Sequence, residues 1–163
     1  MTASKTASKT ATGDRAAKAD KVANVWTDEE RAAMQASVRE RKASAGRDPV
    51  AERAEGEAEV RAKLADMPPV DRAMGERIHE LVLGAAPTLV PRTYYGMPAY
   101  AKDGKVICFY KPASKFKVRY STFEFQPDAR LDDGAIWPVS FAVTELNPNS
   151  EARIVELVKQ AIG

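Results

Sequence analysis

Aromatic and basic side chains gather in one segment of the sequence, between residues 92 and 126. Seven of its residues are Lys or Arg and two are Asp or Glu, so the segment carries a local positive charge. Lysine and arginine attract phosphates and carboxylates, and aromatic rings stack on bases and on cations. This segment therefore predicts a site for a small anion or for nucleic acid. The candidate ligand-binding residues in and near it are Tyr94, Tyr95, Met97, Tyr100, Lys111, Lys115, Lys117, Arg119 and Trp137.

Alternation from Lys115 to Phe125 predicts a strand with two different faces. Its aromatic and aliphatic residues would lie on one face and its basic residues on the other, so the two groups share a pocket only where a bulge intervenes. Gly96 and Pro98, in the preceding segment, are suited to form such a bulge. Lysines on an exposed sheet also hinder edge-to-edge association, and this structural role is the alternative interpretation of the basic face.

Residues that bind soft metal ions are scarce. His79 is the single histidine and Cys108 the single cysteine, so the sequence cannot build a histidine-rich centre or an internal disulfide. His79 stands beside the apolar stripe of a predicted helix, and we expect it on the helix surface rather than at a metal. Cys108 lies among apolar residues, which predicts a buried and unreactive thiol.

Asp132 and Asp133 are the weak candidates for metal ligands, because hard cations such as iron accept oxygen ligands. The following Gly134 favours the alternative, in which the two aspartates form a turn. The glutamates between residues 52 and 59 are interspersed with basic residues, which is typical of a solvated helix face.

Known catalytic patterns do not occur in the sequence. It contains no hydrolase elbow, no phosphate-binding glycine loop, no dinucleotide fingerprint and no Cys-x-x-Cys pair. The sequence therefore favours a binding function over an enzyme. An enzyme whose site is assembled by oligomerisation is the third alternative.

Length and composition predict one ordinary domain, since 44% of the 163 residues are hydrophobic and 29% are charged. The first residues repeat Ala-Ser-Lys-Thr and contain no large apolar side chain before Val22, so residues 1–24 are predicted to be a disordered basic tail. Neither a secretory signal nor an apolar run of membrane-spanning length occurs, and we expect a cytoplasmic protein.

Capping signals and apolar spacing predict four helices, at about residues 28–45, 48–67, 69–85 and 147–162. The first opens with the capping-box spacing Thr27-Asp28-Glu29-Glu30. Asp48-Pro49 and Asn147-Pro148 each combine an N-cap residue with a first-turn proline. The first two helices have thin apolar stripes, so residues 25–67 are predicted to be a charged helical extension.

Aromatic and β-branched segments predict strands at about residues 93–101, 106–111, 115–125 and 139–143. The first is expected to be broken or bent at Gly96 and Pro98, and to be bulged or to lie at a sheet edge. Asp103-Gly104 predicts a tight hairpin. Helices at both ends of such a meander predict an α+β fold, with an antiparallel sheet of about four to five strands packed against helices in two layers. Residues 68–163 form the predicted domain.

One run of residues, Tyr94-Tyr95-Gly96-Met97-Pro98-Ala99-Tyr100, is followed by the Asp-Gly hairpin, by Val106-Ile107-Cys108-Phe109, by Lys115-Phe116-Lys117-Val118 and by Trp137-Pro138. In this order, over about residues 65–162, these segments resemble the YdhG-like family, a domain of unknown function. The charged helices before residue 65 look like those of longer bacterial members.

The resemblance implies a fold comparable with that of frataxin and suggests that some members act as intracellular iron chaperones. Several relatives have a histidine where this chain has Ser114-Lys115-Phe116, and this departure weakens the expectation of iron. The sequence thus predicts a non-enzymatic binding or chaperone domain, whose ligand is iron, by resemblance only, or a small anion. The alternative is a nucleic-acid-associated accessory protein that uses the tail and the basic strand. A homo-oligomer is consistent with the thin stripes of the first helices.

Overall fold

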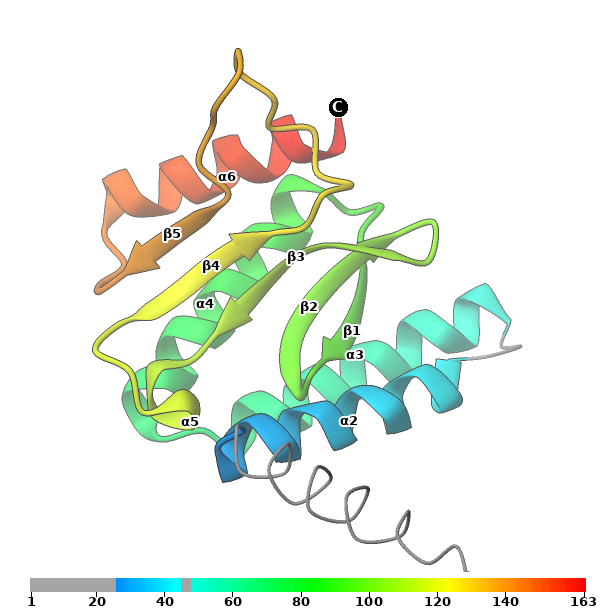
Figure 1. The fold of residues 1–163 in the computed structure, drawn as a ribbon. Coiled ribbons are helices and arrows are strands. Elements are labelled where there is room, and N and C mark those ends of the chain that lie inside the picture. Colours follow the sequence, from blue (N-terminus) through cyan, green and yellow to red (C-terminus); the bar gives the residue numbers. More distant parts are fainter. Residues whose placement is uncertain (1–25, 45–47) are drawn as a thin grey trace, which may run out of the picture.

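The computed structural model describes residues 26–44 and 48–163. The predicted tail of residues 1–24 lies outside these ranges. The described residues form five helices and a five-stranded antiparallel sheet whose strands lie in sequence order (Figure 1). The predicted α+β fold and the strand number are confirmed. None of the helices in the described ranges has both the length and the apolar character that a bilayer crossing requires.

The helices are α2 (Asp28–Ser44), α3 (Pro49–Ala65), α4 (Pro69–Ala85), α5 (Ala113–Phe116) and α6 (Pro148–Ile162). Three of them begin at the caps that the sequence predicts. The amide of Glu30 donates to the Thr27 hydroxyl at 3.1 Å, and the Asp48 carboxylate accepts from the amide of Ala51 at 3.3 Å. The Asn147 side chain accepts from the amide of Ser150 at 3.0 Å. Each cap satisfies amides that the first helical turn leaves unpaired.

The strands are β1 (Val90–Tyr94), β2 (Met97–Lys102), β3 (Lys105–Lys111), β4 (Ser121–Phe125) and β5 (Ser140–Val143). The predicted strand over 93–101 is interrupted at Gly96, but the interruption is a complete reversal at Tyr95-Gly96, so that two paired strands, β1 and β2, replace one bent strand. Strand β1 lies at the edge of the sheet. Both turn residues have positive φ, of 50° and 72°, which is the two-residue geometry that suits a right-twisted hairpin. The Asp103-Gly104 hairpin is confirmed, with φ of 52° and 77°.

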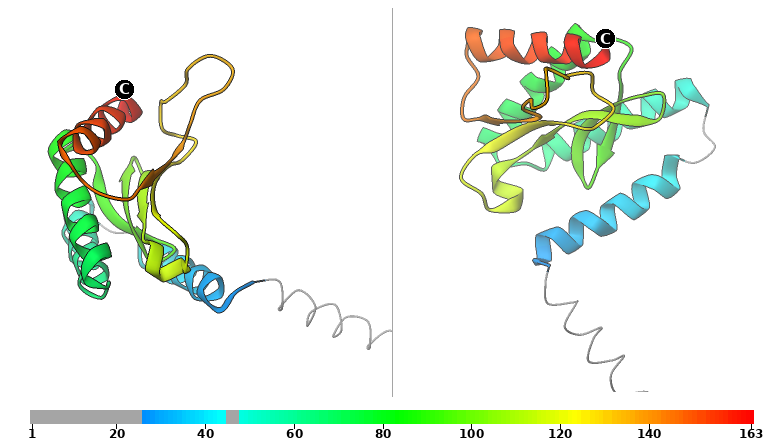
Figure 2. Two further views of the ribbon diagram at one scale, coloured as in Figure 1. Left: turned by 90° about the vertical axis from the view of Figure 1, so that its left-hand side faces the viewer. Right: turned by 45° about the horizontal axis from the view of Figure 1, so that its top comes forward.

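Helices α4 and α6 cover one face of the sheet and bury the main core against it (Figure 2). Because successive side chains of a strand point to opposite faces, every second residue points toward these helices, and several of these residues are aromatic. The helices contribute the apolar stripes that their spacing predicts. This core includes Ile78, Val82, Tyr100, Cys108, Tyr110, Phe123, Phe125, Ile154, Leu157 and Val158. Cys108 is buried as predicted, and burial raises the pKa of its thiol.

Helix α3 packs directly on β1 and β2. Gly56 is buried where the helix meets β1, and a methyl group at this position would overlap the carbonyl oxygen of Pro91. Val60 and Leu64, one and two turns further on, are fully buried. The thin stripe of α3 is therefore sufficient to dock it, because a glycine lets the two backbones approach closely.

The predicted strand over 115–125 is wrong in its first half. Pro112 precedes the short helix α5, Lys117 closes it in the left-handed conformation with φ of 52°, and strand β4 begins only at Ser121. Buried Asp71 of α4 accepts a hydrogen bond from the amide of Ser114 at 3.0 Å and binds the Ser114 hydroxyl as well. The amide of Ser114 is thus bound to Asp71, and it is not free to donate to a neighbouring strand.

Candidate functional site

A second, smaller apolar cluster lies on the face of the sheet opposite α4 and α6. Met97, Ala99 and Phe109 are buried in it. They lie on this face because they alternate along their strands with residues of the main core. Tyr94 packs on Phe109 with ring centroids 5.3 Å apart and meets the ring of Tyr95 edge-on at 4.6 Å. The β1–β2 turn thus folds its tyrosines over the sheet.

Two lysines border this cluster through the ring of Phe116. The ammonium of Lys111 lies 5.0 Å from the ring centroid, and that of Lys115 lies 5.5 Å from it. Both distances are within the range of cation–π attraction. Lysines and tyrosines therefore border the same apolar cluster, and the lysines reach it through Phe116 of α5 rather than through a bulged strand.

Lys115 has an unusual environment for a lysine. Its side chain is half-buried, and its ammonium donates a hydrogen bond to the carbonyl oxygen of Tyr95 at 2.9 Å. Burial and the nearby positive charge of Lys63 lower the pKa of Lys115, while the carboxylate of Glu40 acts in the opposite direction. The group is thus a cation held by a neutral oxygen and repelled by a second cation.

A pocket of about 370 Å³ opens beside this ammonium. It lies between the end of α3, the start of α4, the β1–β2 turn and α5. The positive charges on its wall come from Lys63 and Lys115, and Asp66 supplies a negative charge. The remaining lining residues are Met67, Pro68, Gly96, Pro112 and Ser114. The pocket combines apolar walls with two amines, which suits a short organic anion.

Helix α2 reaches the same place with a carboxylate. The amide of Gly96 donates to Glu40 Oε1 at 2.8 Å. A methyl group at Gly96 would overlap the ammonium of Lys115, so the turn amide and the lysine amine are neighbours. The carboxylate of Glu40 therefore lies at the corner of the pocket that the amide of Gly96 and the amine of Lys115 form.

The other basic residues of the predicted site lie outside the pocket. Lys117 is exposed and forms an ion pair with Glu29 of α2, which raises the pKa of the lysine. Arg119 lies over the ring of Tyr120 at 4.9 Å. The predicted basic face of Lys115, Lys117 and Arg119 is thus dispersed, because the three residues do not belong to one strand.

Tyr100 is fully buried in the main core on the α4 side of the sheet and does not line the pocket. Its hydroxyl lies 3.1 Å from Nδ1 of His79, and Nε2 of that histidine lies 2.9 Å from Glu57 Oε1. The predicted surface position of His79 is wrong, since 3% of its side chain is exposed. Both ring nitrogens have partners, and this explains how the histidine is accommodated in the core.

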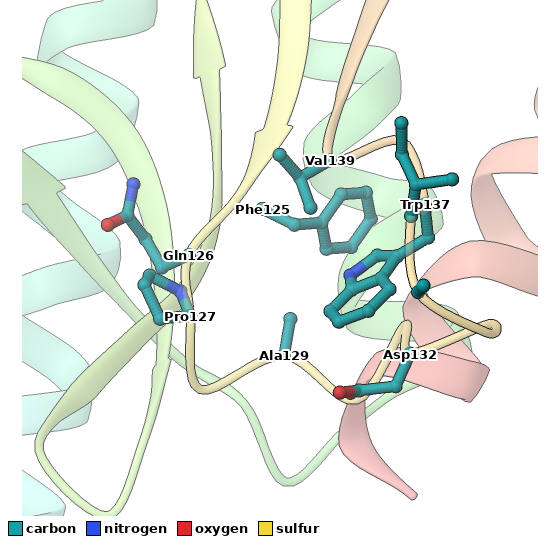
Figure 3. A pocket seen from close by; sticks show the side chains of 9 residues that line it. Phe125, Gln126, Pro127, Ala129, Asp132, Trp137 and Val139 are labelled. Carbon is teal, nitrogen blue, oxygen red and sulfur yellow. The ribbon is translucent and has the colours of Figure 1, made fainter.

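Trp137 lines a different depression, of about 570 Å³, under the loop between β4 and β5 (Figure 3). Its indole lies near Phe125 and Ala129, and the carboxylate of Asp132 is at the rim. Asp133 is exposed and does not line this depression. Within residues 26–44 and 48–163, no three His, Cys, Asp or Glu side chains are grouped to hold a metal ion.

Sequence reasoning missed Lys63, Glu40 and the amide of Gly96 as parts of the site. The two side chains lie on the predicted charged helices, where they look like solvated residues. No periodicity signal identifies them, because their role depends on the docking of α2 and α3 beside α5. Comparisons of the chain with protein-family models, with curated proteins and with solved structures gave no match.

Proposed function

We propose that this chain is a binding domain for a small organic anion, held in the pocket between Lys63 and Lys115. The observation that carries the proposal is the half-buried ammonium of Lys115, whose hydrogen bond goes to the neutral carbonyl of Tyr95. Lys105 and Lys117 instead form ion pairs with Asp128 and Glu29. An anion in the pocket would offset the repulsion between Lys63 and Lys115.

The chemistry of the pocket favours a carboxylate. The adjacent amide of Gly96 already donates a hydrogen bond to the Glu40 carboxylate at 2.8 Å, so a carboxylate group fits this donor. A ligand carboxylate would compete with Glu40 or bind beside it. The apolar wall of Met67, Pro68 and Pro112 would contact the short carbon chain of the ligand.

The test is a titration of the ¹⁵N-labelled full chain with pyruvate, followed by NMR. We expect saturable shifts of the amides of Gly96 and Lys115. A charged hydrogen bond contributes about 1.5–3 kcal/mol, so Lys63→Gln and Lys115→Met should each weaken binding about tenfold or more. Lys105→Met removes the same charge from an exposed site and should leave the affinity unchanged. Shifts that do not saturate, or that persist in Lys115→Met, would contradict the proposal.

Iron and nucleic acid remain the alternative ligands, and the same spectra distinguish them. Ferrous iron, which the resemblance to YdhG-like proteins suggests, would broaden the amides near Asp132 and Asp133. A single-stranded oligonucleotide would shift residues around Lys117 and Arg119, and its affinity would fall steeply with added salt because bound counterions are released. Either pattern without pocket shifts would replace the anion proposal.

A further inference from the structure

Lys115 differs chemically from Lys105 and Lys117, which form ion pairs with carboxylates. The carboxylates of Asp128 and Glu29 raise the pKa values of Lys105 and Lys117, so these amines stay protonated. Lys115 has the opposite shift, caused by its burial and by Lys63. A lysine in this situation offers more free amine at neutral pH, and the free amine is the nucleophilic form.

The groups around the amine would orient a bifunctional ligand. Lys63 lines the same pocket and supplies a positive charge, while the main-chain carbonyl of Tyr95 fixes the amine at 2.9 Å. Gly96 has no side chain, and this leaves room for the amine at the turn. Asp66 lines the pocket wall, and the carboxylate of Glu40 on α2 acts on the charge of Lys115.

We propose that the amine of Lys115 captures the carbonyl group of a 2-oxo acid as a reversible imine, with the carboxylate of that acid paired to Lys63. A 2-oxo acid carries its carbonyl carbon next to its carboxylate, and the pocket places an amine near a second cation. The contact between the carboxylate of the 2-oxo acid and Lys63 rests on the anion-binding function proposed above. The reactivity of Lys115 is a separate property.

The reaction balances without any oxidant or metal. The lone pair of Nζ forms a bond to the carbonyl carbon, and the π electrons of the C=O bond move to the oxygen, which gains a proton. The resulting carbinolamine loses this oxygen as water after a second proton transfer, and the C=N bond forms. Hydrolysis reverses the steps and releases the 2-oxo acid with Lys115 as the free amine.

Reductive trapping tests the proposal. The full chain is incubated near neutral pH with pyruvate and sodium cyanoborohydride, which reduces the imine to a stable secondary amine. Intact mass and peptide mapping then locate the added group. We expect one modification, at Lys115, formed faster than at any other lysine. Lys115→Arg keeps the charge and should abolish it, whereas Lys105→Arg, at an exposed ion pair with Asp128, should leave the rate at Lys115 unchanged.

Butanone is the matched neutral ketone, and it separates the two proposals. Lys63→Gln raises the pKa of Lys115, so it should slow trapping of both ketones by the same factor through the loss of free amine. If Lys63 also binds the carboxylate, trapping of pyruvate should slow about tenfold more than trapping of butanone. Selective trapping of both compounds at Lys115 at equal rates supports the reactive amine and overturns the anion site. Saturable pyruvate binding without trapping, or trapping spread evenly over exposed lysines, overturns the imine inference. Lys63 is exposed, so its substitution should not affect folding.

Discussion

The ammonium of Lys115 lies 2.9 Å from the carbonyl oxygen of Tyr95, the first residue of the β1–β2 turn. This contact joins α5 to a hairpin that precedes it by about 20 residues. The turn therefore positions the amine, and the amine in turn occupies the space that a side chain at Gly96 would need.

The titration of Lys115 should reveal the charges around it. Its pKa should lie below the usual 10.5, because burial and Lys63 disfavour the charged form. Lys63→Gln should move the pKa up, toward 10.5, and Glu40→Gln should move it further down. The measurement is NMR of the lysine side-chain resonances as a function of pH. Shifts of the same sign in both variants would contradict this arrangement.

Gly96 and Gly104 form a matched pair for the turn geometry. Both have positive φ, of 72° and 77°, so alanine should cost about 1 kcal/mol of unfolding free energy at each. Only the methyl group at Gly96 meets Lys115, whereas Gly104 has open space around it. Chemical denaturation should show similar losses for the two variants, and only Gly96→Ala should also lower pyruvate affinity.

Gly56 and Gly84 predict opposite effects of the same substitution. A methyl group at Gly56 would overlap the carbonyl of Pro91, and overpacking of this kind costs about 1–3 kcal/mol or more. Gly84, inside α4, has nothing within 4 Å of the added carbon, so alanine should stabilise by about 0.5–1 kcal/mol. Urea denaturation checks both signs, and a tolerated Gly56→Ala would contradict the close packing of α3 on β1.

Tyr100→Phe should destabilise the core without changing the pocket. The variant removes the hydroxyl that lies 3.1 Å from Nδ1 of His79 and leaves a buried nitrogen unpaired. Such a loss costs about 1–3 kcal/mol. Thermal unfolding should report the loss, while pyruvate binding to the folded variant should equal that of the wild type. A large change in affinity would mean that Tyr100 belongs to the site.

Stability should fall at alkaline pH because of buried groups whose pKa is raised on folding. Burial raises the pKa of Tyr110 from 10.0 to about 12, and it also raises that of Cys108. Between the unfolded and folded pKa values the unfolded chain binds fewer protons, so the stability present below pH 9 is lost as pH rises. Cys108→Ala should reduce this loss in denaturation measured from pH 8 to 11. An unchanged slope would show that the thiol does not contribute.

Local signals in the sequence determined many elements of the fold. The caps at Thr27, Asp48 and Asn147 and the Asp103-Gly104 hairpin act over three or four residues, and the structure contains each of them. The apolar repeat of α4 and the buried setting of Cys108 also follow from residue type and spacing. The resemblance to YdhG-like proteins, and the iron that it implies, stay predictions.

Only the tertiary structure decided where the candidate site lies. Alternation favoured a strand through Lys115, but Asp71, 43 residues earlier in the chain, holds the amide of Ser114 and stabilises α5 instead. Lys63 and Glu40 come from helices that appear solvated in sequence. Their position beside Lys115 depends on the docking of α2 and α3, and such long-range contacts leave no periodic pattern in the sequence.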